Sequence, residues 1–426
     1  MHSHPRIAIV GGGPGGLTLT LLLHRQGIAS TVFERDTHPT ERPQGGTLDL
    51  HEGSGLLALE QAGLMDAFRA AARYEDQGSR QYDTQGRLLF DHDPGAEGER
   101  PEIDRSALRA MLLDALPVDT VRWARNLRDV YDHGDGRWNL VFDGGGEGPF
   151  DLVVGADGTW SRIRPLLSPY KPQYSGVCFI EFGIDDVDRA HPALAALVGR
   201  GKMGAEGGGK ALIVQRNGHS HFRGYAIFRV PLGWAEKRFD FTSPQAVRQG
   251  LIREFDGYDD TLLDLIRASG DRFAVLPLHA LPVGHCWNHR KGLTLLGDAA
   301  HVMSPFGGEG VNNAMHDALE LARALTGEST FDDAVAAYET AMFARVVPSA
   351  EEAALSIATL LSHDPDPPPM HARPCARSAL APTSHRAPSP SHHTVKNNLP
   401  PTSGAFLSPP PPSPPRPPGP CRPRHA

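Results

Sequence analysis

The sequence predicts an α/β fold in which a parallel sheet flanked by helices is interrupted by a second, antiparallel sheet. Three observations lead to this prediction. Residues 7–34 run from a short apolar strand through a glycine turn and a helix into a second strand. Residues 170–271 contain longer alternating segments typical of an antiparallel sheet. Residues 292–298 return to a short apolar strand, so the antiparallel segment is predicted to be an inserted domain.

The first glycine turn has the spacing of a dinucleotide-binding loop. Gly11, Gly13 and Gly16 fit the pattern G-x-G-x-x-G. In this pattern the first glycine allows a tight turn, the second lets the backbone approach a pyrophosphate, and the third lets helix and strand pack closely. Glu34 ends the second strand, near the spacing at which a carboxylate reaches ribose hydroxyls. The alternative is a tight turn with no ligand.

Two further segments bear on the same site. Gly45 and Gly46 precede an alternating stretch that ends at His51, which indicates either backbone held close to a cofactor or a bulge at a strand end. Arg105 and Arg109 lie four residues apart on a predicted helix. Their guanidinium groups share a face, so both can reach one anionic ligand unless they are simply solvent-exposed.

Two later strands also end in an acidic residue beside a glycine. Asp157 precedes Gly158, and Asp298 follows a glycine. Ligands of parallel sheets bind at the carboxyl ends of the strands, although Asp157 could instead cap a following short helix. A glycine-rich loop at 304–310 then leads into a helix predicted over 312–325, whose positive dipole end would face a ligand. A last helix, predicted over 331–361, is expected to be bent or interrupted at Pro348.

Composition narrows the class of protein. The 426-residue chain has a formal net charge of −8, although the segment from Asp364 onward is basic, so the rest is markedly acidic. An acidic body argues against nucleic acid as a partner. Four cysteines without paired spacing favour a reducing, cytoplasmic compartment. No apolar run approaches the roughly 20 residues of a membrane span, so no membrane partner is expected.

The segment 364–426 differs from everything before it. It holds more than half of the chain's 38 prolines and shows no hydrophobic periodicity. Such a composition predicts disorder with polyproline II character. Either the segment binds proline-reading modules or it has no selected role.

The glycine and acid signatures occur in an order that resembles one family. The matching residues are Gly11, Gly13, Gly16 and Glu34, then Asp157, Gly158 and Arg164, then Gly297, Asp298, Pro305 and Gly310. Together they resemble the flavoprotein aromatic hydroxylases, which are FAD monooxygenases. The stretches 45–55 and 62–64 are most similar to the tetracycline-inactivating members. The resemblance covers about residues 5–362.

The resemblance implies a domain organisation. A Rossmann-like FAD-binding domain would comprise residues 1–169 and 272–330, with a substrate-binding sheet domain at 170–271 between its two parts. A long C-terminal helix at 331–363 and the disordered tail at 364–426 would follow.

The resemblance also implies a role for each matching residue. Glycines of the first loop would hold the FAD pyrophosphate, Glu34 the adenosine ribose, and residues 305–312 the isoalloxazine ring. Asp157 and Gly158 would serve FAD and NADPH. The expected cofactor-binding residues are Gly11, Gly13, Gly16, Glu34, Arg35, Arg42, Asp49, Arg105, Arg109, Asp157, Gly158, Asp298, Pro305, Gly308, Gly310, Val311 and Asn312.

The implied reaction uses NAD(P)H and O2 to hydroxylate a small aromatic or polyketide-like substrate through a C4a-hydroperoxyflavin. Candidate pocket residues are Glu181, Arg223, Tyr225 and Phe306. The protein is expected to be a monomer or homodimer without a metal. The alternatives are another FAD-dependent oxidoreductase of the same fold and a catalytically silent flavin-binding protein.

Three details remain open. Glu309 stands where the family has glutamine in P-x-x-G-Q-G, so it either adds an anion near the flavin or faces solvent. His301 either transfers a proton or has a structural role, as a packed side chain or a cap. His285, Cys286 and His289 could suggest zinc, but a fourth ligand is missing, which favours an ordinary loop.

Overall fold

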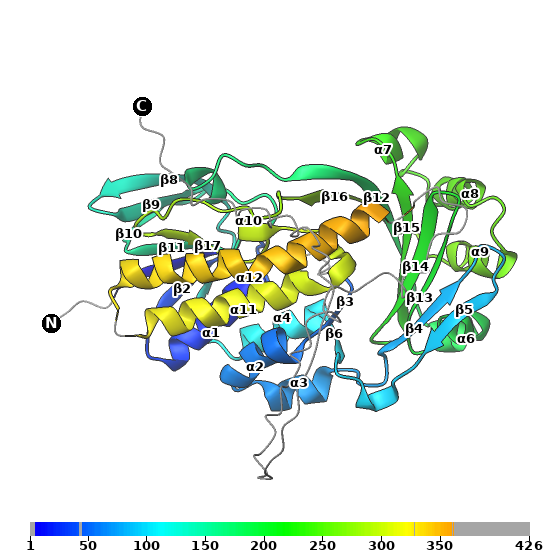
Figure 1. The fold of residues 1–426 in the computed structure, drawn as a ribbon, viewed down its shortest axis with the longest axis horizontal. Helices are drawn as coiled ribbons and strands as arrows, with labels where there is room; N and C mark the ends of the chain where they lie inside the picture. The colour runs from blue at the N-terminus through cyan, green and yellow to red at the C-terminus, as the bar shows by residue number, and fades with distance from the viewer. Residues whose placement is uncertain (1–4, 42–44, 328, 360, 362–426) are drawn as a thin grey trace, which may run out of the picture. The chain divides into compact units, whose positions relative to one another are not determined.

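A parallel sheet lies at the centre of the first half of the molecule (Figure 1). The computed structural model describes residues 5–41, 45–327, 329–359 and 361, and in this part of the chain five strands pair in the order β17-β11-β1-β2-β7. Every pair is parallel. The strands are β1 (Ile7–Val10), β2 (Ser30–Phe33), β7 (Val121–Arg122), β11 (Leu152–Gly155) and β17 (Leu293–Leu295). All residues of β1, β11 and β17 are buried, as expected for central strands of a parallel sheet.

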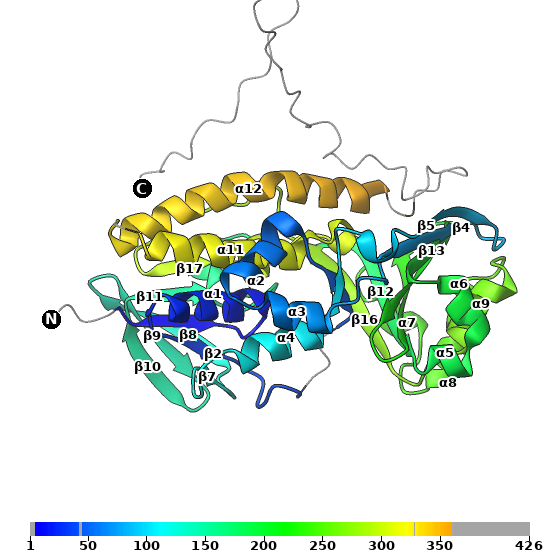
Figure 2. The same cartoon turned by 90° about the horizontal axis from the view of Figure 1, so that it is seen from below.

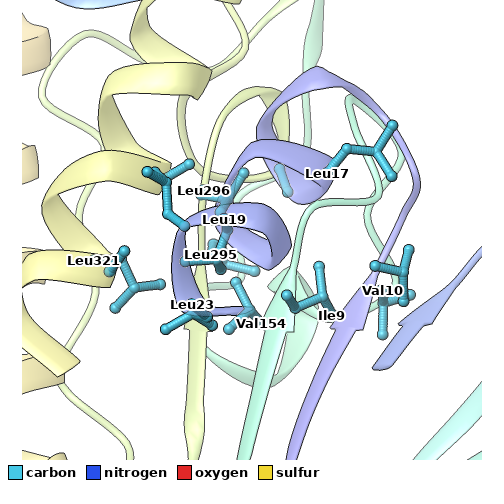
Figure 3. Packing of buried hydrophobic residues seen from close by; sticks show 14 of the residues in the cluster. Ile9, Val10, Leu17, Leu19, Leu23, Val154, Leu295, Leu296 and Leu321 are labelled. Carbon is cyan, nitrogen blue, oxygen red and sulfur yellow. The ribbon is translucent and has the colours of Figure 1, made fainter. Parts of the chain in front are cut away.

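Three helices form the layers beside this sheet. Helix α1 (Pro14–Arg25) packs on the sheet and against α11 (Glu309–Leu325), and α12 (Phe331–Thr359) runs along α11 (Figures 1 and 2). A proline at the start of α1 presets the helical φ angle. Figure 3 shows how leucines of α1 meet side chains of the three central strands and of α11. The labelled residues are Ile9, Val10, Leu17, Leu19, Leu23, Val154, Leu295, Leu296 and Leu321.

A small antiparallel sheet packs beside the parallel one. It consists of β8 (Leu127–Gly134), β9 (Arg137–Phe142) and β10 (Gly145–Phe150). Phe33 of β2 stacks on Phe142 with ring centroids 4.7 Å apart, and the ring of Phe150 meets it edge-on. These aromatic contacts fix the small sheet to the central one.

The second half contains a seven-stranded sheet in the order β16-β12-β15-β14-β13-β4-β5. Its strands are β4 (Gly78–Tyr82), β5 (Leu88–His92), β12 (Gln173–Ile184), β13 (Gly201–Gly207), β14 (Lys210–Asn217), β15 (His221–Arg229) and β16 (Phe273–Ala280). All neighbours are antiparallel except β4 and β13, which are parallel. The sheet therefore uses strands from before and after the predicted inserted range of 170–271.

Successive side chains along these strands point to opposite sides, so the sheet has two different faces. One face packs against a group of short helices (Figure 1). These are α5 (Val187–Ala190), α6 (Pro192–Val198), α7 (Trp234–Arg238), α8 (Pro244–Glu254) and α9 (Asp260–Arg267). The opposite face carries Val177, Phe179, Ala211 and Ile227, which cluster with Phe306 from the loop before α11. This second face therefore meets the first half of the molecule.

Short elements link the two halves. β3 (Thr47–Asp49) pairs with β6 (Glu102–Asp104), and α4 (Arg105–Asp114) follows β6 directly. A π-helical turn at Glu52–Leu56 leads into α2 (Leu57–Gln61) and α3 (Met65–Ala71). The remaining elements are α10 (Asp298–His301) and 3-10 turns at Gly95–Glu97, Arg164–Leu166 and Pro305–Gly307.

The predicted α/β fold with its interrupting antiparallel sheet is confirmed. Helix α11 begins at Glu309, earlier than the predicted 312, and α12 continues through Pro348. The disorder predicted for the tail concerns residues that the structure does not describe. None of the described helices combines the length and apolar composition required to cross a membrane.

Candidate functional site

The first glycine loop contains two glycines required by packing and one that faces open space. A methyl group on Gly11 would lie 2.3 Å from the carbonyl oxygen of Ala156, and one on Gly16 would lie 2.2 Å from that of Gly11. Both distances are steric clashes with backbone. A methyl group on Gly13 would meet nothing within 4 Å. Gly13 therefore borders open space at the N-terminus of α1, as a phosphate-binding helix terminus requires.

Glu34 and Arg109 hold this loop from behind. Glu34 is 4% exposed and accepts hydrogen bonds from the amides of Gly12 (2.6 Å) and Asp36 (3.0 Å). Arg109 is also buried and donates to the carbonyl oxygens of Gly12 (3.1 Å) and Pro39 (2.6 Å). The solvent-exposed alternative is therefore wrong for Arg109. Each Glu34 oxygen keeps a lone pair with which it can accept a ribose hydroxyl.

Two arginines, Arg35 and Arg42, follow Glu34 in the sequence. Arg35 is exposed beside Glu34. Arg42, which the sequence also predicts as a cofactor contact, lies outside the described residues.

The Asp157 loop lies directly against the first glycine loop. A methyl group on Gly11 would be 3.0 Å from the Cα atom of Asp157. Asp157 Oδ2 accepts a hydrogen bond from the amide of Arg162 (2.7 Å), so the residue does organise the turn that follows it. Its Oδ1 atom is buried and has no hydrogen-bond partner among the described residues. Burial raises the pKa of Asp157, although hydrogen bonds from Ser161 and Arg162 oppose this shift. A buried oxygen without a partner favours a ligand that supplies a hydrogen bond there.

Asp298 faces the Asp157 loop from the other side. Arg164 is buried and donates to the carbonyl oxygens of Thr159 (2.7 Å) and Ala299 (3.0 Å), which ties the two loops together. The Thr159 hydroxyl lies 3.5 Å from Asp298 Oδ2. Asp298 is exposed, and a methyl group on Gly310 would be 4.0 Å from its Oδ1 atom. The side chain thus lies next to the first turn of α11.

The stretch that follows Gly45 and Gly46 lies against the same first turn. The side chain of Asn312 donates to the carbonyl oxygen of Asp49 (2.9 Å) and accepts from the amide of His51 (2.9 Å). A methyl group on Gly308, whose φ is +68°, would be 2.9 Å from Asp49 Oδ1. These contacts hold β3 beside the N-terminus of α11, where Pro305, Gly310 and Val311 also lie.

Glu309 does not face solvent. It is 8% exposed, and its Oε1 atom lies 3.6 Å from Nδ1 of His51, whose Nε2 atom is 3.1 Å from Asp49 Oδ2. Burial works to raise the pKa of Asp49, but the hydrogen bond from His51 and the charges of Lys202 and Arg100 outweigh it and hold that pKa below its usual range. The solvent-facing alternative for Glu309 is therefore wrong.

Sequence reasoning missed Glu102. Burial and the nearby charge of Asp49 raise the pKa of Glu102 to about 7, although Thr47 donates a hydrogen bond to it at 2.6 Å. No local signal marks Glu102, because residues 99–105 are mostly charged and Thr47 and Asp49 come from a distant part of the chain.

All four candidate pocket residues come together on the second face of the large sheet. Arg223 Nη1 lies 2.6 Å from Glu181 Oε1, and Arg223 sits beside Tyr225 on the same face. The ring of Phe179 is 5.4 Å from that of Tyr225 and 5.7 Å from that of Phe306. Burial and the charge of Glu181 raise the pKa of Tyr225 to about 12, so its phenol stays protonated at neutral pH.

Arg105 links this face to the glycine loops. A methyl group on Gly45 would be 3.4 Å from Arg105 Nε, and one on Gly46 would be 3.2 Å from the Tyr225 hydroxyl. Burial lowers the pKa of Arg105, while the charges of Asp298 and Tyr225 oppose this shift. Arg105 therefore lies within electrostatic range of both halves of the site.

The remaining candidates have structural roles. His301 is buried with Nε2 2.7 Å from Asp317 Oδ2, and Asp317 also accepts from the amide of Gly297 (2.7 Å), so the packing interpretation of His301 holds. His285 bonds to the Ala300 carbonyl oxygen (2.7 Å) and to Ser168 (2.8 Å). Within the described ranges no group of three or more His, Cys, Asp or Glu side chains could hold a metal ion.

Comparisons with known proteins agree with this geometry. The family model described as "FAD binding domain" matches residues 5–257 and 259–340. The chain is 34% identical over 367 residues to the monooxygenase penA of Penicillium thymicola, which covers 75% of this chain and 84% of that protein.

Two solved structures are similar in fold. HpxO of Klebsiella pneumoniae, complexed with FAD and uric acid, superposes with a TM-score of 0.72 at 21% identity, over 85% of this chain and 90% of the other. The tetracycline destructase Tet(51) gives a TM-score of 0.64 at 21% identity, over 85% and 92%. The family match and the penA similarity show that the chain belongs to the FAD-binding-domain flavoproteins and is an FAD-dependent monooxygenase.

Proposed function

We propose that FAD lies along the line of loops formed by Gly13, Asp157, Asp298 and the first turn of α11. The observation that supports this most is the convergence of these loops around open space at Gly13. The residues present fit the cofactor. Glu34 would accept the ribose hydroxyls, the amide of Gly13 would face the pyrophosphate, and the unpaired Asp157 oxygen would accept a hydrogen bond.

The N-terminus of α11 would hold the isoalloxazine ring. The positive end of a helix stabilises negative charge, and Gly308, Gly310, Val311 and Asn312 supply backbone that can approach the ring closely. When bound, FAD would supply the redox chemistry of the proposed reaction, with NAD(P)H as the reductant and O2 as the oxidant. The chain itself would bind and orient the ring and exclude water from it.

The substrate would lie between the flavin site and the large sheet. Phe179, Tyr225 and Phe306 offer apolar ring surfaces there, and Arg223 and Glu181 offer polar contacts. Such a surface suits a small aromatic or polyketide-like molecule. Tetracycline, which is part of the name of one of the two similar structures, is a polyketide and is compatible with this class.

The domain assignment belongs to the same proposal. Residues 1–169 and 272–330 would serve as the FAD-binding domain, and 170–271, joined by β4 and β5, as the substrate domain. We also propose a cytoplasmic location, on the basis of the unpaired spacing of the four cysteines. The monomeric or homodimeric state expected from the sequence stays a proposal.

Flavin absorbance, NAD(P)H oxidation and product formation test the proposal. The purified chain is expected to carry FAD and to oxidise NADH or NADPH under air, faster when a suitable phenol is added, with a hydroxylated product by mass spectrometry. A protein that takes up no FAD after reconstitution would overturn the cofactor site. FAD without substrate-stimulated oxidation across a broad aromatic panel would overturn the proposed reaction.

A further inference from the structure

The two charged pocket residues on the large sheet form an ion pair. Glu181 pairs with Arg223 at 2.6 Å, and the two side chains are only 22% and 16% exposed. Arg105 lies within electrostatic range of Asp298, Arg223 and Tyr225. The Glu181–Arg223 pair therefore offers no net positive charge to an anionic ligand.

The ring surfaces of the site and its phenol are uncharged. Phe179, Tyr225 and Phe306 form an apolar wall, and the Tyr225 phenol remains a neutral hydrogen-bond donor because burial raises its pKa to about 12. Arg223 Nε is buried and has no hydrogen-bond partner among the described residues. A buried donor without a partner favours a ligand that brings an acceptor.

The ion pair changes what Arg223 can bind. A free guanidinium binds a carboxylate through two parallel hydrogen bonds, which makes arginine the usual receptor for aromatic acids. Glu181 already occupies one of its terminal nitrogens. A carboxylate ligand would approach Glu181 as a second anion in a partly desolvated place, and two such charges repel strongly there.

We propose that this site, assuming the monooxygenase function proposed above, selects uncharged planar aromatic molecules with a hydrogen-bond acceptor, and that Glu181 is the specificity-determining residue that rejects aromatic carboxylates. Arg223 donates to the acceptor, and the ring lies against Tyr225 and Phe306. The repulsion between Glu181 and a carboxylate contributes to this selection as much as the hydrogen bond from Arg223 does.

A matched pair of ligands tests this on the FAD-loaded enzyme. Naphthalene-2-carboxamide and 2-naphthoate have nearly the same shape and differ in charge. Titration calorimetry on the wild type is expected to show the amide binding at least about tenfold more tightly than the carboxylate. Glu181→Gln is expected to reduce or reverse this ratio by about tenfold, because the amide side chain keeps the volume and removes the anion.

Two variants serve as controls. Glu254→Gln removes a carboxylate that pairs with Arg238 at the same 2.6 Å on the helical side of the sheet, and it is expected to leave the ligand ratio unchanged. Arg223→Gln keeps Glu181 and removes its cation, so it is expected to weaken the carboxylate still further. The wild-type ratio alone also tests the proposal should a variant not fold.

The outcomes separate this inference from the proposed function. Equal or tighter binding of 2-naphthoate by the wild type overturns the inference, and so does an unchanged ratio in a folded Glu181→Gln protein. Failure of both naphthyl compounds to bind at millimolar concentration also overturns it. Loss of the proposed function would appear earlier and separately, as a protein without FAD or without substrate-stimulated NAD(P)H oxidation.

Discussion

The glycine loops of the first half and the open face of the large sheet build their parts of the site in different ways. In the loops, backbone approaches backbone: methyl groups at Gly11 or Gly16 would clash with carbonyl oxygens at 2.3 and 2.2 Å. On the sheet, side chains meet side chains, as in the Glu181–Arg223 pair. The loops therefore admit few residue types, whereas the sheet face admits many. We expect the first region to define the cofactor and the second to define the substrate.

The loop region can be broken most severely at Gly16. Gly16→Ala is expected to destabilise the protein by about 3 kcal/mol or more, because the added methyl must separate β1 from α1. Thermal or urea unfolding, with FAD retention after gel filtration, measures the effect. Gly13→Ala is the matched control: it is expected to keep the stability and lose FAD affinity. Equal stability of the two variants would contradict the packing argument.

The corresponding change in the sheet is Gly224→Ala. Its methyl group would lie 2.2 Å from the ring of Phe182, a buried side chain on the helical side. Because a side chain rather than backbone must move, we expect a smaller loss of about 1–2 kcal/mol in urea unfolding. FAD retention should be unchanged. A loss as large as that of Gly16→Ala would remove the distinction between the two regions.

Asp298→Ala separates cofactor binding from folding within the loop region. Asp298 is exposed, so its removal is expected to change the melting temperature little. The same change should weaken FAD binding by about tenfold or more, because it removes the proposed contact between Asp298 and FAD beside the first turn of α11. A fluorescence titration of apo protein with FAD gives the dissociation constant. An unchanged constant would rule out the assigned role.

The smallest expected effect concerns pH and His289, which lies 2.9 Å from both Asp332 and Glu339. Burial lowers the pKa of His289, but the hydrogen bonds to Asp332 and Glu339 outweigh it and raise that pKa above 6.5. Its contribution to stability is thus complete below pH 6.5 and is lost as the pH rises through the folded-state value. His289→Gln should lower the free energy of unfolding more at about pH 6 than at about pH 8. An equal loss at both values would contradict this assignment.

The two regions also differ in how far the sequence predicts them. Gly11, Gly13, Gly16 and Glu34 follow from one local pattern, because a tight turn between strand and helix restricts nearby residues. Asp298 follows from a second local pattern, a short apolar strand that ends in a glycine and an acidic residue. The predicted loops do converge, as the contacts of Asp157 and Asp298 with their neighbours show.

Long-range pairing explains what the sequence did not predict. Strands β4 and β5 join the large sheet because Gly78 pairs with Gly201 across more than a hundred residues, and nothing local in residues 78–92 indicates this. The raised pKa of Glu102 and the orientation of Glu309 toward His51 depend on the same distant packing. The pocket residues on β12 and β15 were identified individually, but their pairing depends on strand register.

A crystal structure of the chain with FAD bound would test the central claim most directly. We predict one FAD molecule with its pyrophosphate at the amide of Gly13, its ribityl region near Asp298, and its isoalloxazine ring between the first turn of α11 and Tyr225. FAD bound at another surface, or loops that contact no ligand at all in crystals containing FAD, would contradict the account.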